Sequence, residues 1–473
     1  MKYSKKSKII SKKRSSKKMF FRNFTAEELG NVFNGRISSK DDAGIDGIHP
    51  HDLKPKESFE IIERKVSHGT YHFTPYAEVQ FSKGRGKSPR IIALATVRDQ
   101  ITLSALKNYL HDTFPNSVAH KLPNSYVFEL NKEIQKVKNN KKSFGFIHTD
   151  ISGFYDNIDR EKMMNIIRSK VDIPEALKLI YRAVANPIVP RNSRLVQRFH
   201  YYTPKGVPQG LSISNILASI YMTNFDKIIK SLSSYYVRYV DDIIILCPKA
   251  KISTVMEKLH YETSKLGLEL NKEKTNTGII NKDALVFLGY ILRADGIIGV
   301  KDDSVRRKTS GLAGVISSAD HKKYEFLKLH KKIDNNTYKK VLVENINEQI
   351  TGAISGKKRY GWLFYFSQIN DMALLHRLDR IVGKLCERCQ TFSKQKPKTV
   401  KSFVTAFREI HKIKHGIVPS YIPNYDDWNI KKKVKYLYER GLLVKRKGYT
   451  EIEINRLIYR RLRYLERDIK NIS

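Results

Sequence analysis

Two neighbouring aspartates, Asp241 and Asp242, stand between two apolar runs of the sequence. The runs 235–240 and 243–246 have the composition of β-strands, and their junction at a polar pair predicts a tight hairpin with both carboxylates at its tip. A single aspartate in a turn is explained by local hydrogen bonding. Two adjacent carboxylates repel each other unless a cation lies between them. The pair therefore indicates a divalent metal site.

A third carboxylate, Asp150, follows another strand-like run that begins at Phe144. If this strand lies beside the hairpin, Asp150 and Asp241 converge at one edge of a sheet. Two Mg²⁺ ions about 4 Å apart require such a set of carboxylates, and Mn²⁺ is the alternative ion. One ion would lower the pKa of an attacking 3′-hydroxyl, and the other would hold a triphosphate and stabilise the leaving pyrophosphate.

Amphipathic helices alternate with these strands over residues 20–300. Apolar residues at helical spacing predict helices that begin near Asp159, Ile213 and Ile252. Short strands with helices between them predict an α+β fold in which an antiparallel sheet carries helices on one face. From about residue 301 the strand patterns fade, and helices with Lys/Arg-rich faces take over.

The charge of the chain points to a polyanionic partner. Its 473 residues include 88 Lys and Arg against 47 Asp and Glu, a formal charge of +41. Because self-repulsion of this size disfavours a compact state, nucleic acid is the first predicted partner and an anionic membrane the second. The absence of a signal peptide and of an apolar run of about 18 residues, together with only three cysteines, predicts a soluble, cytoplasmic protein.

Five motifs in a fixed order carry a resemblance to a known family. Together they resemble the palm of reverse transcriptases, whereas any one alone would be a weak signal. Segments 44–48 and 69–75 are similar to the fingers of the bacterial branch, which includes group II intron and retron enzymes. The five motifs are Asp150-Ile-Ser-Gly-Phe-Tyr155, Gly206-Val-Pro-Gln-Gly-Leu-Ser212, Tyr239-Val-Asp-Asp242, Leu268-Glu-Leu-Asn-Lys-Glu-Lys-Thr275 and Phe287-Leu-Gly-Tyr290.

The resemblance implies a right-hand polymerase with four parts. These are a flexible basic arm (1–20), fingers and palm (21–300), a helical thumb (301–395) and a helical, basic C-terminal extension (396–473). The last 170 or so residues show no second carboxylate cluster, so neither an RNase H nor an endonuclease is expected. A free-standing enzyme with a helical extension most resembles the phage-defence-associated, abortive-infection type of reverse transcriptase.

The resemblance also implies roles at the predicted metal site. Asp150 and Asp241 would be catalytic and would ligate both ions, and the carbonyl oxygen of Ile151 would be a further ligand. Asp242 would contribute more weakly or from a greater distance. Tyr155 matches the aromatic gate whose ring leaves no room for a 2′-hydroxyl, which favours deoxynucleotides.

Four more residues are predicted to bind nucleotide. Gln209 would hold the incoming nucleotide or the template base, and Lys83 and Arg90 would bind the triphosphate. Lys274 matches a lysine that protonates the leaving pyrophosphate. An exposed basic turn around Lys83 and an ordinary surface lysine at position 274 are the simpler alternatives. Ser212 is placed to cap the helix that follows it.

Two patterns in the C-terminal third are explained more simply by packing than by function. Cys386, Cys389, His411 and His415 form a two-plus-two set of zinc ligand types, but the 21 residues between Cys389 and His411 exceed the usual spacing. Trp362 and Phe366 lie four positions apart, which predicts core residues on one helix face.

The predicted function is RNA-directed DNA polymerase, using dNTPs, an RNA template and a DNA primer or product. The motifs exclude a membrane as the main partner, and the excess positive charge predicts a companion non-coding RNA. An untemplated or protein-primed DNA polymerase and a non-catalytic RNA-binding or maturation scaffold are the alternatives. Tyr155 disfavours an RNA-dependent RNA polymerase. The oligomeric state stays open.

Overall fold

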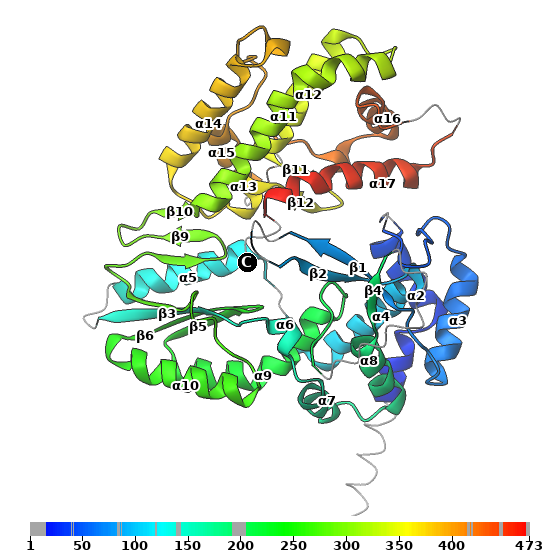
Figure 1. Ribbon diagram of the computed structural model, residues 1–473, viewed down its shortest axis with the longest axis vertical. Coiled ribbons are helices and arrows are strands. Elements are labelled where there is room, and N and C mark those ends of the chain that lie inside the picture. The colour runs from blue at the N-terminus through cyan, green and yellow to red at the C-terminus, as the bar shows by residue number, and fades with distance from the viewer. Residues whose placement is uncertain are drawn as a thin grey trace, which may run out of the picture. The chain divides into compact units, whose positions relative to one another are not determined.

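The computed structural model describes residues 16–38, 40, 42–82, 86, 88–118, 121–138, 143–191, 205–413, 417, 420–443 and 448–469. The chain forms two compact units (Figure 1). The first unit comprises Met1–His120 and Ile147–Thr277, and the second comprises Lys121–Phe146 and Gly278–Ser473. Among the residues just given, no helix is long and apolar enough to cross a membrane.

The first unit contains most of the strands around the predicted metal site. Its helices are α2 (Ala26–Val32), α3 (Pro55–Ser67), α4 (Val97–Thr113), α6 (Phe154–Asn157), α7 (Arg160–Arg168), α8 (Pro174–Ala185), α9 (Ser214–Leu232) and α10 (Ile252–Lys265). Its strands are β1 (Tyr76–Phe81), β2 (Arg90–Leu94), β4 (Ile188–Pro190), β5 (Tyr235–Tyr239) and β6 (Asp242–Pro248). The chain passes from one unit to the other within β3 (Phe144–Asp150) and β7 (Asn276–Ile279).

Two sheets organise these strands. In one, β1 lies between β2 and β4, antiparallel to β2 and parallel to β4. The other has the order β5-β6-β3-β7, so that β3 lies beside the β5–β6 hairpin. Helices α9 and α10 lie side by side along one face of this sheet (Figure 1). The predicted strands and the helices on one face are therefore confirmed.

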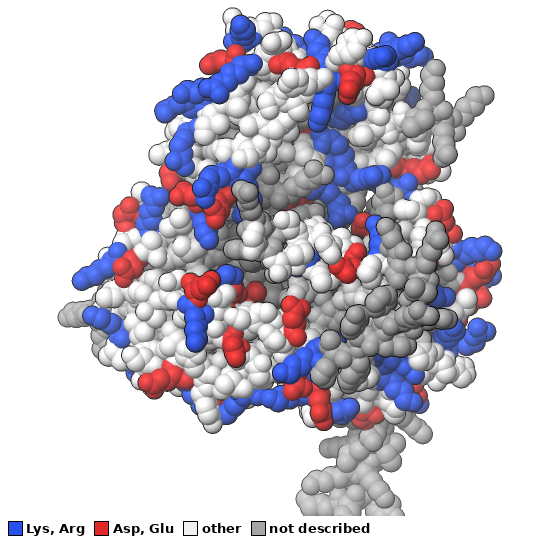
Figure 2. All heavy atoms as spheres, viewed as in Figure 1, with Lys and Arg blue, Asp and Glu red and all other residues white. Residues whose placement is uncertain are grey.

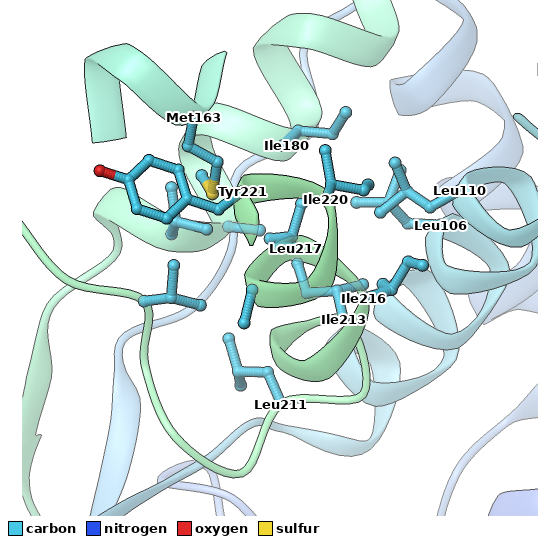
Figure 3. Packing of buried hydrophobic residues seen from close by; sticks show 14 of the residues in the cluster. Leu106, Leu110, Met163, Ile180, Leu211, Ile213, Ile216, Leu217, Ile220 and Tyr221 are labelled. Carbon is cyan, nitrogen blue, oxygen red and sulfur yellow. The ribbon is translucent and has the colours of Figure 1, made fainter. Parts of the chain in front are cut away.

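Helix α9 contributes many buried residues to the first unit's core, and its apolar residues repeat at helical spacing. The structure confirms this helix, and likewise those expected near Asp159 and Ile252, as α7 and α10. Figure 3 shows α9 packed against side chains of α4, α7 and α8. The residues labelled there are Leu106, Leu110, Met163, Ile180, Leu211, Ile213, Ile216, Leu217, Ile220 and Tyr221.

The predicted cap of α9 is wrong. The helix starts after Ile213, and no side chain caps it. The Ser212 hydroxyl is buried without a hydrogen-bond partner in the described part of the chain. Instead, the hydroxyl of Ser214 donates to the carbonyl oxygen of Pro208 at 2.5 Å. This hydrogen bond links the Pro-Gln-Gly segment to the first residue of the helix.

The second unit is mainly helical. Its helices are α5 (Pro123–Lys138), α11 (Asp302–Leu329), α12 (Asn335–Thr351), α13 (Trp362–Tyr365), α14 (Met372–Glu387), α15 (Phe403–Ile413), α16 (Ile430–Glu439) and α17 (Glu451–Leu462). Strands β8 (Leu285–Phe287), β9 (Tyr290–Leu292) and β10 (Ile298–Val300) form an antiparallel sheet. Strands β11 (Ala353–Ser355) and β12 (Lys358–Tyr360) form a hairpin that the sequence patterns did not predict.

A buried carboxylate ties the C-terminal segments to α12. Glu348 is 3% exposed and accepts hydrogen bonds from the hydroxyls of Tyr425, Tyr436 and Tyr464. The guanidinium groups of Arg461 and Arg440 lie 3.4 and 3.8 Å from its oxygens. Burial raises the pKa of Glu348, but the two arginines and the hydroxyls outweigh it and hold that pKa below its usual value. The ionised Glu348 is therefore compensated from several sides.

The other C-terminal patterns lie mostly in the core. Trp362 and Phe366 are fully buried, as predicted. The Cys389 thiol donates to Asp320 at 3.6 Å, and His411 Nδ1 lies 2.9 Å from the carbonyl oxygen of Phe407. His415 lies outside the described residues.

Candidate active site

The tip of the β5–β6 hairpin meets the end of β3. Tyr239 pairs with Asp242, so the turn itself consists of Val240 and Asp241. The amide of Ile151 donates to the carbonyl oxygen of Asp241 at 3.2 Å, and Asp150 is 8% exposed. Burial, and next the Asp150 carboxylate, raise the pKa of Asp241 to about 6. The structure thus brings together the two aspartates that the sequence predicts to converge.

The segment after α10 is held against the end of β3. The amide of Asn271 donates to the carbonyl oxygen of Asp150 at 2.7 Å, and that of Ser152 donates to Glu269 at 2.9 Å. This attachment places Lys274 Nζ in contact with the Asp150 carboxylate. The Lys274 side chain is 59% exposed, so it can leave this ion pair without opening the core. Lys274 therefore lies beside the predicted metal ligand Asp150, with which it forms an ion pair.

Asp242 also has a close partner, the imidazole of His148. His148 Nε2 lies 2.8 Å from Asp242 Oδ1, and the two side chains are 16% and 15% exposed. His148 stands two positions before Asp150 on β3, which places both side chains on the same face of the strand. Sequence analysis missed His148, although its spacing of two from Asp150 was a signal that could have identified it.

The side chains at this junction are of the types that a divalent cation binds. Asp150, Asp241 and Asp242 supply carboxylate oxygens, which Mg²⁺ prefers as ligands. The raised pKa of Asp241 reflects burial and negative charge that a cation would offset. Lys274 and His148 contact oxygens that an ion would need. In the described ranges, no group of three or more His, Cys, Asp or Glu side chains is placed so that it could hold a metal ion.

Tyr155 lies on α6, which is tied to the segment around the Pro-Gln-Gly motif. Its hydroxyl donates to Asn215 Oδ1 at the start of α9, and its carbonyl oxygen accepts from Val207 at 2.8 Å. Burial, and next the Asp241 carboxylate, raise the pKa of Tyr155 well above its usual value, while Arg238 and Arg90 lower it. Tyr155 is thus within electrostatic reach of Asp241, and Asn215 is a contact that sequence analysis missed.

Gln209 and Gly210 connect the same segment to β2. The carbonyl oxygen of Gln209 accepts from Ala93 at 2.7 Å, and its side chain donates to Asp156 at 3.3 Å. Gly210 has a φ of +99°, and a Cβ there would lie 2.4 Å from a methyl group of Ile92. The close approach therefore requires glycine.

Of the two residues predicted to bind the triphosphate, the structure describes only Arg90. Arg90 is the first residue of β2, and it acts on the pKa of Tyr155. Lys83 lies outside the described residues. The remaining predicted residues, Asp150, Ile151, Tyr155, Gln209, Asp241, Asp242 and Lys274, all belong to the first unit.

The motifs fall within a stretch that matches a known family. Residues 82–292 match the family model described as reverse transcriptase (RNA-dependent DNA polymerase). The group II intron-encoded protein LtrA of Lactococcus lactis subsp. cremoris is 24% identical over 226 residues, which are 46% of this chain and 34% of LtrA. An uncharacterized 91 kDa protein in the cob intron of Schizosaccharomyces pombe is 23% identical over 420 residues, 84% of this chain and 48% of that protein. The chain thus spans a third to a half of the length of these relatives.

A bacterial relative and two solved structures are also similar. Protein YkfC of Escherichia coli strain K12 is 23% identical over 297 residues, 53% of this chain and 75% of that protein. The telomerase of Candida albicans, solved in complex with a fragment of telomeric RNA, aligns with a TM-score of 0.42 and 14% identity over 86% of this chain and 62% of that one. The apo telomerase of Candida tropicalis gives a TM-score of 0.40 with 16% identity over 48% and 55% of the two chains.

Proposed function

We propose that this chain, which contains a reverse transcriptase domain over residues 82–292, is an RNA-directed DNA polymerase that extends DNA with dNTPs by a two-metal mechanism. The convergence of Asp150 and Asp241 at the junction of β3 with the β5–β6 hairpin is the observation that carries the proposal. Two ionisable carboxylates in one partly buried place suit the binding of divalent ions that activate a hydroxyl and stabilise a leaving pyrophosphate.

In this proposal each residue at the junction has a role. Asp150, Asp241 and the carbonyl oxygen of Ile151 would hold the ions, with Asp242 kept in place by His148. Lys274 would leave Asp150 when the ions bind and would donate a proton to the pyrophosphate, which its exposed side chain permits. Arg90, together with Lys83, would bind the triphosphate, and Gln209 would contact the nucleotide or template base.

Tyr155 is proposed to select the sugar, so its replacement with valine should relax discrimination between dNTPs and NTPs. The smaller side chain leaves room for a 2′-hydroxyl, and we expect the ratio of kcat/KM for dNTP to that for NTP to fall about tenfold or more. Single-nucleotide extension measures this ratio. Tyr181→Val, at an exposed position on α8, is the matched control. An unchanged ratio in an active Tyr155→Val protein would contradict the role.

The distribution of charge supports a nucleic-acid partner for the second unit. Residues 301–473 contain 39 Lys and Arg against 18 Asp and Glu, a formal charge of +21. On the face shown in Figure 2, Lys and Arg side chains are more prominent over this unit than Asp and Glu side chains. We propose that the unit binds the template duplex and a companion non-coding RNA, and that the DNA synthesis serves defence against phage. RNA affinity should then fall steeply with salt. For each tenfold rise in salt concentration, log K should decrease by about 0.7 to 0.9 for every phosphate contacted.

The purified full chain, with and without the RNA that co-purifies with it, tests the proposed activity. Labelled dNTPs or NTPs are supplied with Mg²⁺ or Mn²⁺, and any product is sequenced. We expect metal-dependent DNA complementary to the RNA. DNA that matches no RNA would favour the untemplated or protein-primed alternative. RNA binding without any incorporation would favour the scaffold alternative and overturn the polymerase.

A further inference from the structure

The turn that carries Asp241 has an unfavourable backbone. Val240 has a φ of +60°, in the left-handed region. Two-residue hairpin turns that need positive φ usually contain Asn, Asp or Gly, because a β-branched side chain is strained there. A valine in this position indicates that contacts outside the turn hold it. The same turn places Asp241 beside Asp150.

One of those contacts comes from Arg238 on β5. Its Nη1 donates to the carbonyl oxygen of Val240 at 2.8 Å. Its other two nitrogen atoms donate hydrogen bonds to the Asp226 carboxylate, Nε to Oδ1 at 2.8 Å and Nη2 to Oδ2 at 2.6 Å. The hydroxyl of Tyr236 also donates to Asp226 Oδ1, at 2.5 Å. The Arg238 side chain is only 8% exposed, so water contributes little to its solvation.

These contacts connect the turn to the core. Asp226 lies on α9, whose apolar face is buried in the centre of the first unit. The planar guanidinium reaches Asp226 and Val240 together, in fixed directions. The position of the strained carbonyl group is therefore set by the buried helix.

We propose that Arg238 is a positioning residue that holds the Val240–Asp241 turn in its strained conformation and so presents Asp241 for divalent-cation binding. This inference rests on the proposed metal-dependent function, because it assigns Asp241 as a ligand. A lysine at position 238 keeps the positive charge but cannot bind Asp226 in two places and Val240 in a third direction. Replacing the arginine should thus release the turn without removing any predicted ligand.

Mn²⁺ binding to the nucleic-acid-free full chain, measured by calorimetry, provides a test that does not depend on turnover. We expect Arg238→Lys to weaken Mn²⁺ binding at least tenfold and to speed amide hydrogen exchange at residues 240–242. Adding Val240→Gly, which removes the steric penalty of positive φ, should restore most of the affinity in the double variant. Affinity within twofold of wild type in Arg238→Lys, or no rescue by Val240→Gly, would overturn the proposal.

Two further variants separate positioning from general damage. Arg440→Lys alters another buried arginine, which pairs with Glu344 at 2.7 Å in the second unit, and should leave Mn²⁺ affinity unchanged. If Arg238→Lys does not fold, Asp226→Asn loosens the same contacts and should weaken Mn²⁺ binding severalfold; normal affinity there would also overturn the proposal. Mn²⁺ binding that depends on Arg238 in a chain that incorporates no dNTP would refute the polymerase and leave this inference standing.

Discussion

Replacing Asp241 with asparagine is expected to lower DNA incorporation at least about a thousandfold, while the metal-free protein becomes no less stable than wild type. The amide keeps the shape of the side chain but removes the charge that would bind the ions. Burial and Asp150 raise the pKa of Asp241 to about 6, so its ionisation costs folding free energy as the pH rises above its ordinary pKa of about 3.9, and the full cost is present above about pH 6. Asparagine removes this cost, with an expected gain of about 1–3 kcal/mol at pH 7.5.

Primer extension and thermal unfolding in the absence of metal measure the two effects on the same preparation. Asp303→Asn, at an exposed position in the first turn of α11, should leave both measurements near wild type. Incorporation within tenfold of wild type in Asp241→Asn would refute the site. A lower unfolding temperature in metal-free Asp241→Asn than in metal-free wild type would refute the expected gain in stability.

Removal of the Glu348 carboxylate should have the largest effect on stability. In Glu348→Ala the guanidinium groups of Arg440 and Arg461 lose a buried counter-charge, and the hydroxyls of Tyr425 and Tyr436 lose an acceptor. Breaking a buried ion pair by deleting one partner costs about 3–5 kcal/mol. Both tryptophans, Trp362 and Trp428, belong to the second unit, so their fluorescence during urea unfolding reports on this unit.

The surface pair of Glu133 and Lys136 on α5 offers a control, because Glu133→Ala should cost no more than about 1 kcal/mol. The pKa of Glu348 lies below its usual value. Its contribution is therefore present above about pH 4.5 and is lost as the pH falls through the lowered pKa. Unfolding of the second unit should accordingly be more acid-sensitive in wild type than in Glu348→Ala. Equal stability of the two proteins at pH 7 would contradict the role of this carboxylate.

Much of the first unit could be predicted because its signals are local. A few residues are enough to predict the strand that ends at Asp150 and the hairpin that turns at Asp241. The structure places that strand, β3, beside β6 of the hairpin. The reverse transcriptase match and the mixed helix and sheet structure confirm the expected α+β, right-hand polymerase fold. The roles of the site residues stay predictions, and the proposed Lys83 contact lies outside the described residues.

The contacts that escaped prediction depend on tertiary structure. His148 and Asp242 are 94 positions apart, and Tyr464 and Glu348 are 116 apart. Composition alone places charged residues such as Glu348 on the surface, and only the folded chain shows the partners that allow burial. Ser212 was misassigned as a cap because the sequence does not show that the helix starts after Ile213, where no side chain caps it.

The interleaving of the two units has a consequence for dissecting this protein. Helix α5 precedes the predicted catalytic strand in the sequence but belongs to the second unit, where Asn124 binds Ser367 at 3.0 Å and Lys138 binds the carbonyl oxygen of Ala294 at 2.9 Å. A fragment that stops at Thr277 would keep α5 and lose both partners. No single cut in the gene therefore yields the first unit alone. The second unit therefore draws on sequence from both sides of the stretch Ile147–Thr277, and removing the residues after Thr277 would not remove it whole.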